Sequence, residues 1–349
     1  MGRVWIAGDC WLKPGAKPVD LPSLWGDVRP DLLVCNLECC VCAGSARAGR
    51  RSVLPLDVNR LPELTPAKDT LCVLANNHVT DYGPDGLLAT LQTLRSAGLS
   101  TLGAGATLSE ARGPLIFQLE GRRVGMLAYA DTRAHVGAVP ATANSPGVAP
   151  LIEELVVEDL GNLLPRVDEI WLYLHWGREY IRYPEPEQRT LASAFARAGA
   201  GLIIGTHPHV IQGWEQIAQA SVYYSLGNFV FPPVPFEDGA LLQWDRESRQ
   251  GIALSGTLDG SGPWRWAQIP YLISPAGKPG VPQGWNGQAL RRKLATRCRA
   301  LDEAYTRKYP RIQKKELLLH RIRRFRMMSW GERLRLPGRM LRWASGRRA

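Results

Sequence analysis

Short apolar runs alternate along the chain with segments of helical periodicity. The apolar runs end in polar residues or glycine, which is typical of strands buried in a sheet. They predict strands at residues 4–7, 32–37, 71–75, 123–130, 170–174 and 202–204. Apolar residues recur every three or four positions in residues 85–97 and 187–198, each followed by glycine, and this spacing predicts two helices. Strands alternating with helices indicate an α/β protein.

Polar side chains that can bind metals follow the predicted strands. In an α/β protein the site lies outside the carboxyl ends of the strands, so one sheet edge can collect these side chains. The candidates are Asp9, Glu38, Asn77, His175, His207 and His209. Carboxylate, amide and imidazole ligands together suit a pair of divalent cations such as Zn, Mn or Fe better than a thiolate-rich zinc site.

Two of these histidines stand one residue apart in Gly205-Thr206-His207-Pro208-His209. A strand that ends here delivers both imidazoles to one place, as a metal site requires. The alternative is that one histidine packs and the other is solvated. His175 has the alternative of a packed residue at a strand end. For Asn77 and Asn228 the alternative is a turn residue, because asparagine tolerates a left-handed backbone.

Length and composition indicate a folded, core-forming protein. The 349 residues suffice for one large domain with an appendage or for two domains, and 45% of the residues are hydrophobic. No apolar run approaches the roughly 18 residues needed to cross a bilayer, and the first residues pass into a strand pattern rather than a signal peptide. We therefore expect a cytoplasmic protein.

Seven cysteines are present, with Cys35, Cys39, Cys40 and Cys42 close together. An odd number crowded into one region does not make a disulfide framework. The spacing also lacks the two separated pairs of a structural zinc site. We expect small buried cysteines lining a turn rather than a metal cluster.

Charge is spread unevenly. Residues 281–349 contain 20 Lys/Arg and 4 Asp/Glu, a net of +16, whereas residues 1–280 contain 23 and 28, a net of −5. A Pro/Gly-rich run comes before the basic part and is typical of a linker. These features predict a domain at 1–272, a linker at 273–288 and a basic helical tail at 289–349.

The basic tail mixes arginines with apolar residues that include Phe325 and Trp330. A basic amphipathic segment of this kind suits an anionic membrane surface, here the inner membrane face. One alternative is a helix packed on the domain with a solvated basic face. Nucleic acid suits the tail less well, because no nucleic-acid module accompanies the charge.

A series of short motifs follows in a specific order: Gly8-Asp9, Asn36-Leu37-Glu38, Ala75-Asn76-Asn77-His78 with Asp81-Tyr82-Gly83, Gly103-Ala104-Gly105, His175-Trp176-Gly177-Arg178-Glu179-Tyr180, Gly205-Thr206-His207-Pro208-His209 and Tyr224-Ser225-Leu226-Gly227-Asn228-Phe229-Val230-Phe231. In this order they resemble the CapA family, whose members take part in capsule and poly-γ-glutamate biosynthesis and are related to calcineurin-like metallophosphoesterases. The resemblance implies a metallophosphoesterase-like fold, in which two sheets pack as a sandwich flanked by helices.

The resemblance also implies a role for each strand-end residue. Asp9 and His209 would serve one metal, and Glu38 would bridge to a second. The second metal would be served by Asn77, His175 and His207. His78 would contact a phosphate-like group or protonate the leaving oxygen.

Three positions depart from the wider phosphoesterase pattern. Trp11 stands where those enzymes have a metal-binding histidine, Glu38 replaces the usual bridging aspartate, and Val79 follows His78 where an acid is usual. The first metal site is therefore one ligand short, and we expect it to be weak or vacant.

The resemblance implies a metal-dependent hydrolase or accessory protein, in which a hydroxide held by two metals attacks a phosphoester or amide. Its substrate would be an anionic polymer or phosphoester, with Arg178, Glu179 and Asn228 as candidate substrate-binding residues. The alternative for Glu179 is a solvated charge that does not bind substrate. Two other functions stay open, a non-catalytic polymer-binding or assembly factor and a general metallophosphodiesterase.

Overall fold

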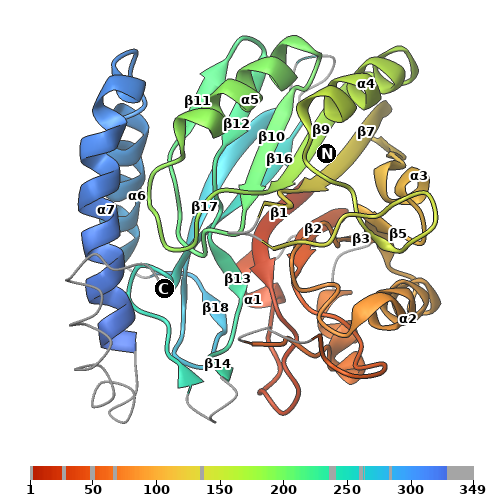
Figure 1. The fold of residues 1–349 in the computed structure, drawn as a ribbon. Helices are drawn as coiled ribbons and strands as arrows, with labels where there is room; N and C mark the ends of the chain where they lie inside the picture. Colours follow the sequence, from red (N-terminus) through yellow and green to blue (C-terminus); the bar gives the residue numbers. More distant parts are fainter. Residues whose placement is uncertain are drawn as a thin grey trace, which may run out of the picture.

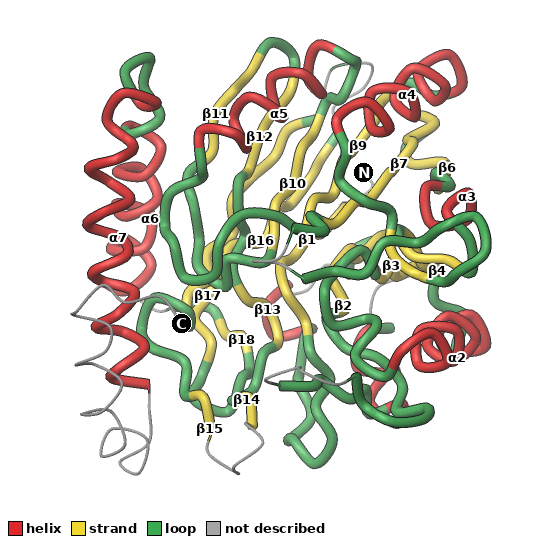
Figure 2. The backbone as a smooth tube through the Cα atoms, viewed as in Figure 1, coloured by secondary structure: helices red, strands yellow, loops and turns green. Residues whose placement is uncertain are grey.

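The computed structural model describes residues 3–25, 29–47, 52–65, 69–133, 137–235, 241–258, 262, 264–282 and 285–327. Two β-sheets pack together, and helices flank them (Figures 1 and 2). This arrangement confirms the predicted α/β class and the two-sheet sandwich flanked by helices.

The first sheet has a parallel part that carries the amino-terminal motifs. Its central strand, β1, lies between parallel β2 and antiparallel β16, and short β13 also pairs with β1 in parallel. The strand order is β18 (Pro279–Gly280), β17 (Arg265–Ile273), β16 (Gln250–Thr257), β1 (Arg3–Cys10), β2 (Leu32–Leu37), β3 (Asp69–Val73) and β4 (Ser100–Leu102), with β13 at Asn228–Val230. The carboxyl ends of β1, β2 and β3 therefore lie side by side.

The second sheet carries the histidine motifs. Strands β7, β9, β10 and β12 run parallel, with antiparallel strands at both edges. The order is β11 (Trp214–Ile217), β12 (Ala220–Tyr223), β10 (Leu202–Thr206), β9 (Glu169–His175), β7 (Arg122–Ala130) and β6 (Leu115–Leu119). Two small pairs complete the strands, β5 (Ala104–Gly105) with β8 (Gly147–Val148) and β14 (Val234–Pro235) with β15 (Leu241–Leu242).

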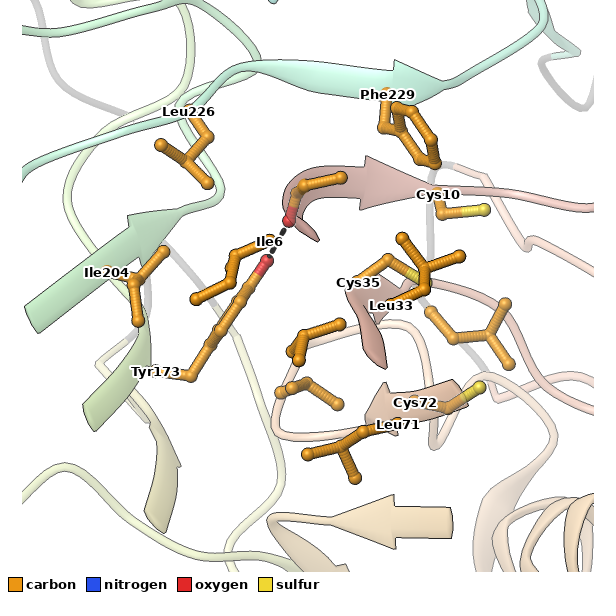
Figure 3. Packing of buried hydrophobic residues seen from close by; sticks show 14 of the residues in the cluster. Ile6, Cys10, Leu33, Cys35, Leu71, Cys72, Tyr173, Ile204, Leu226 and Phe229 are labelled. Carbon is orange, nitrogen blue, oxygen red and sulfur yellow. Dashed lines mark hydrogen bonds between the residues drawn. The ribbon is translucent and has the colours of Figure 1, made fainter. Parts of the chain in front are cut away.

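The core between the sheets is apolar, and a buried hydrogen bond within it joins the two sheets. The Tyr173 hydroxyl on β9 donates to the carbonyl oxygen of Ala7 on β1 at 2.5 Å (Figure 3). Trp171 packs edge-on against Trp264 and Trp266, with ring centroids 5.5 and 5.2 Å away. These contacts join strand ends that are far apart in sequence.

Helices cover the outer faces of the sheets. Two of them, α2 and α5, confirm the helices predicted at 85–97 and 187–198, and each is followed by a glycine with positive φ. In α5, Glu185 and Gln188 form a capping box around Pro186 at the first turn. The helices are α1 (Pro22–Trp25), α2 (Gly83–Ser96), α3 (Leu108–Arg112), α4 (Glu153–Leu163), α5 (Pro186–Arg197), α6 (Trp285–Arg299) and α7 (Tyr305–Met327), with 3₁₀ turns η1 (Val58–Leu64) and η2 (Leu164–Arg166).

The Pro/Gly-rich stretch expected as a linker is partly structured. Pro279 and Gly280 form β18, which pairs with the end of β17, and α6 begins at Trp285. A turn at Ser274 closes this hairpin, because its N–H donates to the Lys278 carbonyl at 2.8 Å. Proline and glycine favour tight turns as well as linkers, so composition alone does not separate the two. The division of the chain into domain, linker and tail stays a prediction.

The described part of the basic tail is helical and packs against the domain. Tyr305 on α7 donates its hydroxyl hydrogen to the Pro184 carbonyl at 2.5 Å, and Arg182 donates from Nη2 to Glu316 at 2.6 Å. Figure 1 shows α6 and α7 side by side at one edge of the sheets. Residues 328–349, which include Trp330, lie outside the described residues. In the part that the structure describes, no helix is both long and apolar enough to span a membrane.

Candidate metal centre

Six polar residues predicted from the sequence meet where the two sheets adjoin. Asp9 lies near the end of β1, Glu38 directly follows β2, and Asn77 lies in the loop after β3, all in the first sheet. Three histidines, His175, His207 and His209, come from the ends of β9 and β10, in the second sheet. Each sheet thus supplies one kind of donor, oxygen from the first and imidazole nitrogen from the second.

Two groups of donor atoms have the spacing of metal ligands, and they share Glu38. One consists of Glu38, His175 and His207, and the other of Asp9, Glu38 and His209, with the atoms of each group within 4.8 Å of one another. All five side chains are buried. Asn77 joins the first group, because its Oδ1 lies 2.9 Å from His175 Nε2. The grouping is the one that the family resemblance implies.

The Glu38 carboxylate shows that these donors fit a cation. Both of its oxygens are buried, and within the described residues neither has a hydrogen-bond partner. Imidazole Nε2 atoms of His78, His175 and His209 lie 3.8, 3.9 and 3.9 Å from Glu38 Oε1, too far for hydrogen bonds. An isolated buried carboxylate is costly, and a divalent ion among these atoms would neutralise it.

Protonation of the metal-free centre follows from this geometry. Burial and the neighbouring Asp9 charge raise the pKa of Glu38 well above its usual value. Burial alone would lower the pKa of His209, but the Glu38 charge and the hydrogen bond to Asp9 outweigh it and raise the pKa to about 10. Burial and the charge of His207 lower the pKa of His175, which favours the neutral imidazole that binds metals. Without an ion the centre therefore retains protons, which an ion would displace.

Two asparagines that sequence reasoning did not select hold the donors in place. Asn36 donates from Nδ2 to Asp9 Oδ1 at 2.8 Å and lies 3.2 Å from His175 Nδ1. Asn76 in turn donates to Asn36 Oδ1 at 3.0 Å. The signal for Asn36 was its place two residues before Glu38, since alternate residues of a strand share a face. These hydrogen bonds orient the His175 ring so that its Nε2 faces Asn77 and Glu38.

Asn228, predicted to bind substrate, lies behind His209. Its Oδ1 is 2.7 Å from His209 Nδ1, and its Nδ2 donates to the Ser248 carbonyl at 3.0 Å. Asn228 is fully buried, so both ends of its amide are used within the protein. The geometry suits a residue that orients His209, leaving Nε2 toward Glu38, better than one that contacts substrate.

His78 stands beside the donors and has an acidic partner. Its Nδ1 is 2.7 Å from Asp81 Oδ2, and Asp81 also accepts from the Leu54 N–H at 2.8 Å. Val79, where an acid is usual in the wider phosphoesterase pattern, is buried and donates its N–H to Asn76 Oδ1. The acid is thus supplied three residues after His78 instead of one.

The backbone of the histidine motif is strained. His207 has φ +93° and His209 has φ +54°, a left-handed region that non-glycine residues avoid. Two glycines permit the close packing around them. A Cβ on Gly205 would lie 2.0 Å from the Tyr224 oxygen, and one on Gly8 would lie 1.7 Å from the Gly227 oxygen. Strain concentrated here is consistent with a functional site.

Trp11 leaves the Asp9 group one donor short. Its indole N–H donates to the Pro55 carbonyl at 2.9 Å, and its ring packs 6.0 Å from Phe231. Indole nitrogen carries no lone pair for a metal. The Asp9 group therefore has three protein donors, whereas the other group has Asn77 in addition.

The remaining predicted residues lie at the rim. Arg178 is exposed and donates to Glu185 Oε1 at 2.7 Å. Glu179 is exposed. Its negative charge raises the pKa of Glu38, although less than burial and the charge of Asp9 do. Arg182, on the same loop, is held by Glu316. The structure thus places Glu179 within electrostatic reach of the donors and ties both arginines to acids.

The four clustered cysteines do not take part. Cys35, Cys39 and Cys40 are buried and Cys42 is exposed, and all are free thiols. Cys35 lies in the apolar core beside Cys10 and Cys72 (Figure 3). Among the described residues, the groups with metal-binding geometry contain no cysteine.

Comparison with known proteins identifies the family. The family model for bacterial capsule synthesis protein PGA_cap matches residues 3–233. The chain belongs to this family. Its PGA_cap relatives include the capsule biosynthesis protein CapA of Bacillus anthracis, 35% identical over 181 residues, which are 50% of this chain and 44% of the relative. The PGA biosynthesis protein CapA of Bacillus subtilis (strain 168) is 36% identical over 173 residues, 49% of this chain and 45% of the relative.

These comparisons confirm the resemblance to the CapA family, although the chain matches less than half the length of either relative. Solved structures give a looser likeness. A putative 5′-nucleotidase from Staphylococcus aureus in complex with α-ketoglutarate is 16% identical, with a TM-score of 0.46 over 84% of this chain and 58% of that one. A phosphatase from Mycoplasma pneumoniae is 12% identical, with a TM-score of 0.46 over 77% of this chain and 93% of that one.

Proposed function

We propose that this PGA_cap protein is a metal-dependent hydrolase in the synthesis of capsule or poly-γ-glutamate, acting on a phosphoester or amide bond. One observation carries the proposal: the buried Glu38 carboxylate makes no hydrogen bond with the described residues and is shared by two groups of metal donors. A buried carboxylate in that position is stable when cations neutralise it. The printed names of the relatives, which concern capsule and PGA biosynthesis, support the biological setting.

In this proposal each residue of the centre has a specific role. Asn77, His175 and His207 would hold one Zn, Mn or Fe ion, Asp9 and His209 would hold a second more weakly, and Glu38 would bridge them. Bound ions would supply Lewis acidity and an activated water. His78 would protonate the leaving oxygen from Nε2 while Asp81 fixes its tautomer through Nδ1. Glu179 at the rim would contact the substrate.

Metal analysis tests this proposal. Purified wild-type protein should contain divalent metal and hydrolyse a generic phosphodiester, and the His207→Ala, His209→Ala double variant should lose both. His320→Ala removes an imidazole from α7, outside the strand ends, and serves as the matched control. If wild-type protein prepared without chelator contains no divalent metal and the double variant behaves as wild type, the proposal is wrong.

Trp11 favours a second candidate, a non-catalytic factor that binds or assembles the polymer. The indole fills the position of a metal-binding histidine and is committed to Pro55. On this hypothesis the chain binds at most one ion and turns over no substrate. Two ions per chain together with phosphodiester turnover would reject it. A panel of phosphodiesters and γ-glutamyl amides separates capsule-related hydrolysis from a general metallophosphodiesterase.

We also propose that the basic helices rest on an anionic membrane surface. The outward face of α7 is exposed and carries Arg307, Arg311, Lys314, Lys315 and Arg321. Leu317 and Leu318 on this helix are exposed as well, at 37% and 56%. Cationic and apolar side chains on one surface suit a bilayer interface.

Charge reversal tests the membrane proposal. The Arg311→Glu, Lys314→Glu, Lys315→Glu variant should lose binding to vesicles containing phosphatidylglycerol, because reversed charges are repelled by an anionic surface. A triple reversal of exposed arginines elsewhere, Arg95, Arg123 and Arg166, controls for net charge. Equal vesicle binding by wild type and the α7 variant would refute the proposal.

A further inference from the structure

A hollow lies between α6 and the edge of the first sheet, away from the metal donors. Its volume is about 620 Å³, and its walls come from Arg246, Arg249 and Gln250, the β17–β18 hairpin and α6. Figure 1 shows α6 beside β17. None of the metal-donor residues lines it.

The lining of the hollow is cationic. Arg246, Arg249, Lys278 and Lys293 line it, and its described lining residues include no carboxylate. These four residues lie on three separate segments, the loop before β16, the β17–β18 turn and α6. Their charges therefore surround the hollow instead of following one helix face.

Three of the four cations have side chains available to a ligand. Lys293 donates to Glu247 Oε1 at 2.5 Å. In the described part of the chain, the side chains of Arg246, Arg249 and Lys278 form no ion pair, and Arg249 Nε is buried without a hydrogen bond. A buried guanidinium N–H without an acceptor is costly, and a bound anion would supply the acceptor.

Apolar side chains separate the cations. Leu272, Ile273 and Leu290 line the same hollow, as does Val281, which is 56% exposed. A compact ion such as phosphate would leave these surfaces uncovered. A flexible chain that carries carboxylates at intervals, with methylene groups between them, would cover both.

The loop from Trp244 to Arg249 connects the hollow with the metal centre. On one side, the Trp244 ring lies 5.5 Å from the His209 ring, and Ser248 accepts a hydrogen bond from Asn228, which holds His209. Arg246 and Arg249 of the same loop line the hollow. A ligand in the hollow would therefore contact the segment that supports His209.

We propose that this hollow is a second binding site, one that takes the carboxylates of a polycarboxylate chain such as poly-γ-glutamate. The identity of the polymer rests on the proposed function, whereas the hollow itself does not depend on the metal centre. The site would hold the polymer next to the loop behind His209 while the metal donors face the scissile bond.

Binding of fluorescein-labelled poly-γ-glutamate to the full-length chain tests the proposal. The Arg246→Ser, Lys278→Ser variant should bind at least about tenfold more weakly, because two charge-assisted contacts are lost. Added salt should reduce the difference in polymer affinity between wild type and this variant, because salt screens the charges. The control variant Arg95→Ser, Arg166→Ser removes the same charge from exposed positions outside the hollow and should bind as wild type.

Further measurements separate this inference from the proposed function. The hollow variant should keep wild-type metal content, and it should bind the polymer more weakly than wild type whether or not metal is present. Inorganic phosphate should not displace the polymer, and vesicle binding should be unchanged in the hollow variant. The inference is overturned if the hollow variant binds the polymer like wild type, or if the control variant weakens binding equally. It is also overturned if phosphate displaces the polymer when the phosphate concentration equals that of the polymer's carboxylate groups.

Discussion

His78 obtains its acidic partner from Asp81, three residues further along the chain. The two side chains meet because the turn after β3 brings Asp81 Oδ2 to 2.7 Å from His78 Nδ1. Asp81 is fully buried and also accepts the Leu54 N–H, so its position is fixed from two sides. The absence of an acid at Val79 therefore does not leave His78 without an orienting group.

Asp81→Asn should slow hydrolysis without removing metal. An amide lacks the charge that stabilises protonated His78 and can hold the wrong tautomer, and loss of such an orienting partner costs about 10- to 100-fold. The rate on a generic phosphodiester and the metal content are measured together. Asp85→Asn, at an exposed position on α2, is the matched control. An unchanged rate in Asp81→Asn would show that His78 does not act through this pair.

The sequence predicted the metal donors better than the residues that hold them. Asp9, Glu38 and the histidines follow apolar strands, and periodicity reveals such positions. Asn36, Asn76 and Asp81 act through contacts between separate strands or around a turn. In a sequence, asparagine and aspartate at these places are indistinguishable from ordinary turn residues. Their roles therefore required coordinates.

At the scale of elements, the first sheet is assembled by close approach of β1 and the segment before β13. Asp9 donates its N–H to the Gly227 oxygen at 3.1 Å, and Gly8 leaves no room for a side chain beside it. This contact brings Asp9 and Asn228 into register as neighbours. Asp9, a donor, and Asn228, which orients the donor His209, thus depend on a single glycine.

Gly8→Ala should destabilise the fold strongly. Its Cβ would lie 1.7 Å from the backbone oxygen of Gly227, so the strands must separate, which costs about 3 kcal/mol or more. Gly161→Ala is the control, because no atom lies within 4 Å of its added Cβ on α4. It should stabilise the helix by about 0.5–1 kcal/mol. Urea unfolding measures both, and equal midpoints would contradict the packing argument.

Periodicity predicted six of the strands and the helices α2 and α5, but not the short parallel strands β4, β12 and β13 or the β16–β17 hairpin. Strand β17 contains Pro270 and Gln268 and is only partly buried, so it lacks a continuous apolar run. The Pro/Gly-rich stretch after it resembles a linker in composition. Pairing with β16 and β18 overrides both signals, as tertiary contacts often do for strands.

At the scale of the whole molecule, ion pairs join the basic helices to the acidic domain in both directions. Glu316 of α7 holds Arg182, and Glu247 before β16 holds Lys293 and Arg297 of α6, each at 2.5 Å. Arg297 is buried, which lowers its pKa, yet a guanidinium stays charged. These contacts fix the helices without covering the outward basic face of α7.

The Glu247 contacts predict a fall in stability in acid. Burial alone would raise the pKa of Glu247, but Arg297 and Lys293 outweigh it and lower the pKa from 4.5 to about 2. Because the folded-state pKa is depressed, this contribution is complete above pH 4.5 and is lost as pH falls toward 2. The shift alone would correspond to about 3 kcal/mol, and solvent screening of the partly exposed carboxylate makes the actual contribution smaller.

Glu247→Gln should therefore be less stable than wild type at neutral pH, and the difference should shrink as pH falls from 4.5 to 2. Urea unfolding across this range measures it. Glu154→Gln, an exposed residue on α4, is the control and should follow wild type throughout. A constant difference between wild type and Glu247→Gln would show that the carboxylate does not titrate as its contacts imply.

If the proposed centre binds metal, the division of its donors between the sheets would affect the order in which the protein matures. Asp9, Glu38 and Asn77 come from one sheet and the three histidines from the other, so neither half alone offers a complete centre. An ion bound by this set would connect the sheets as a cross-link and would select chains in which both have docked. Metal loading would then be the last step of maturation and would mark a finished domain.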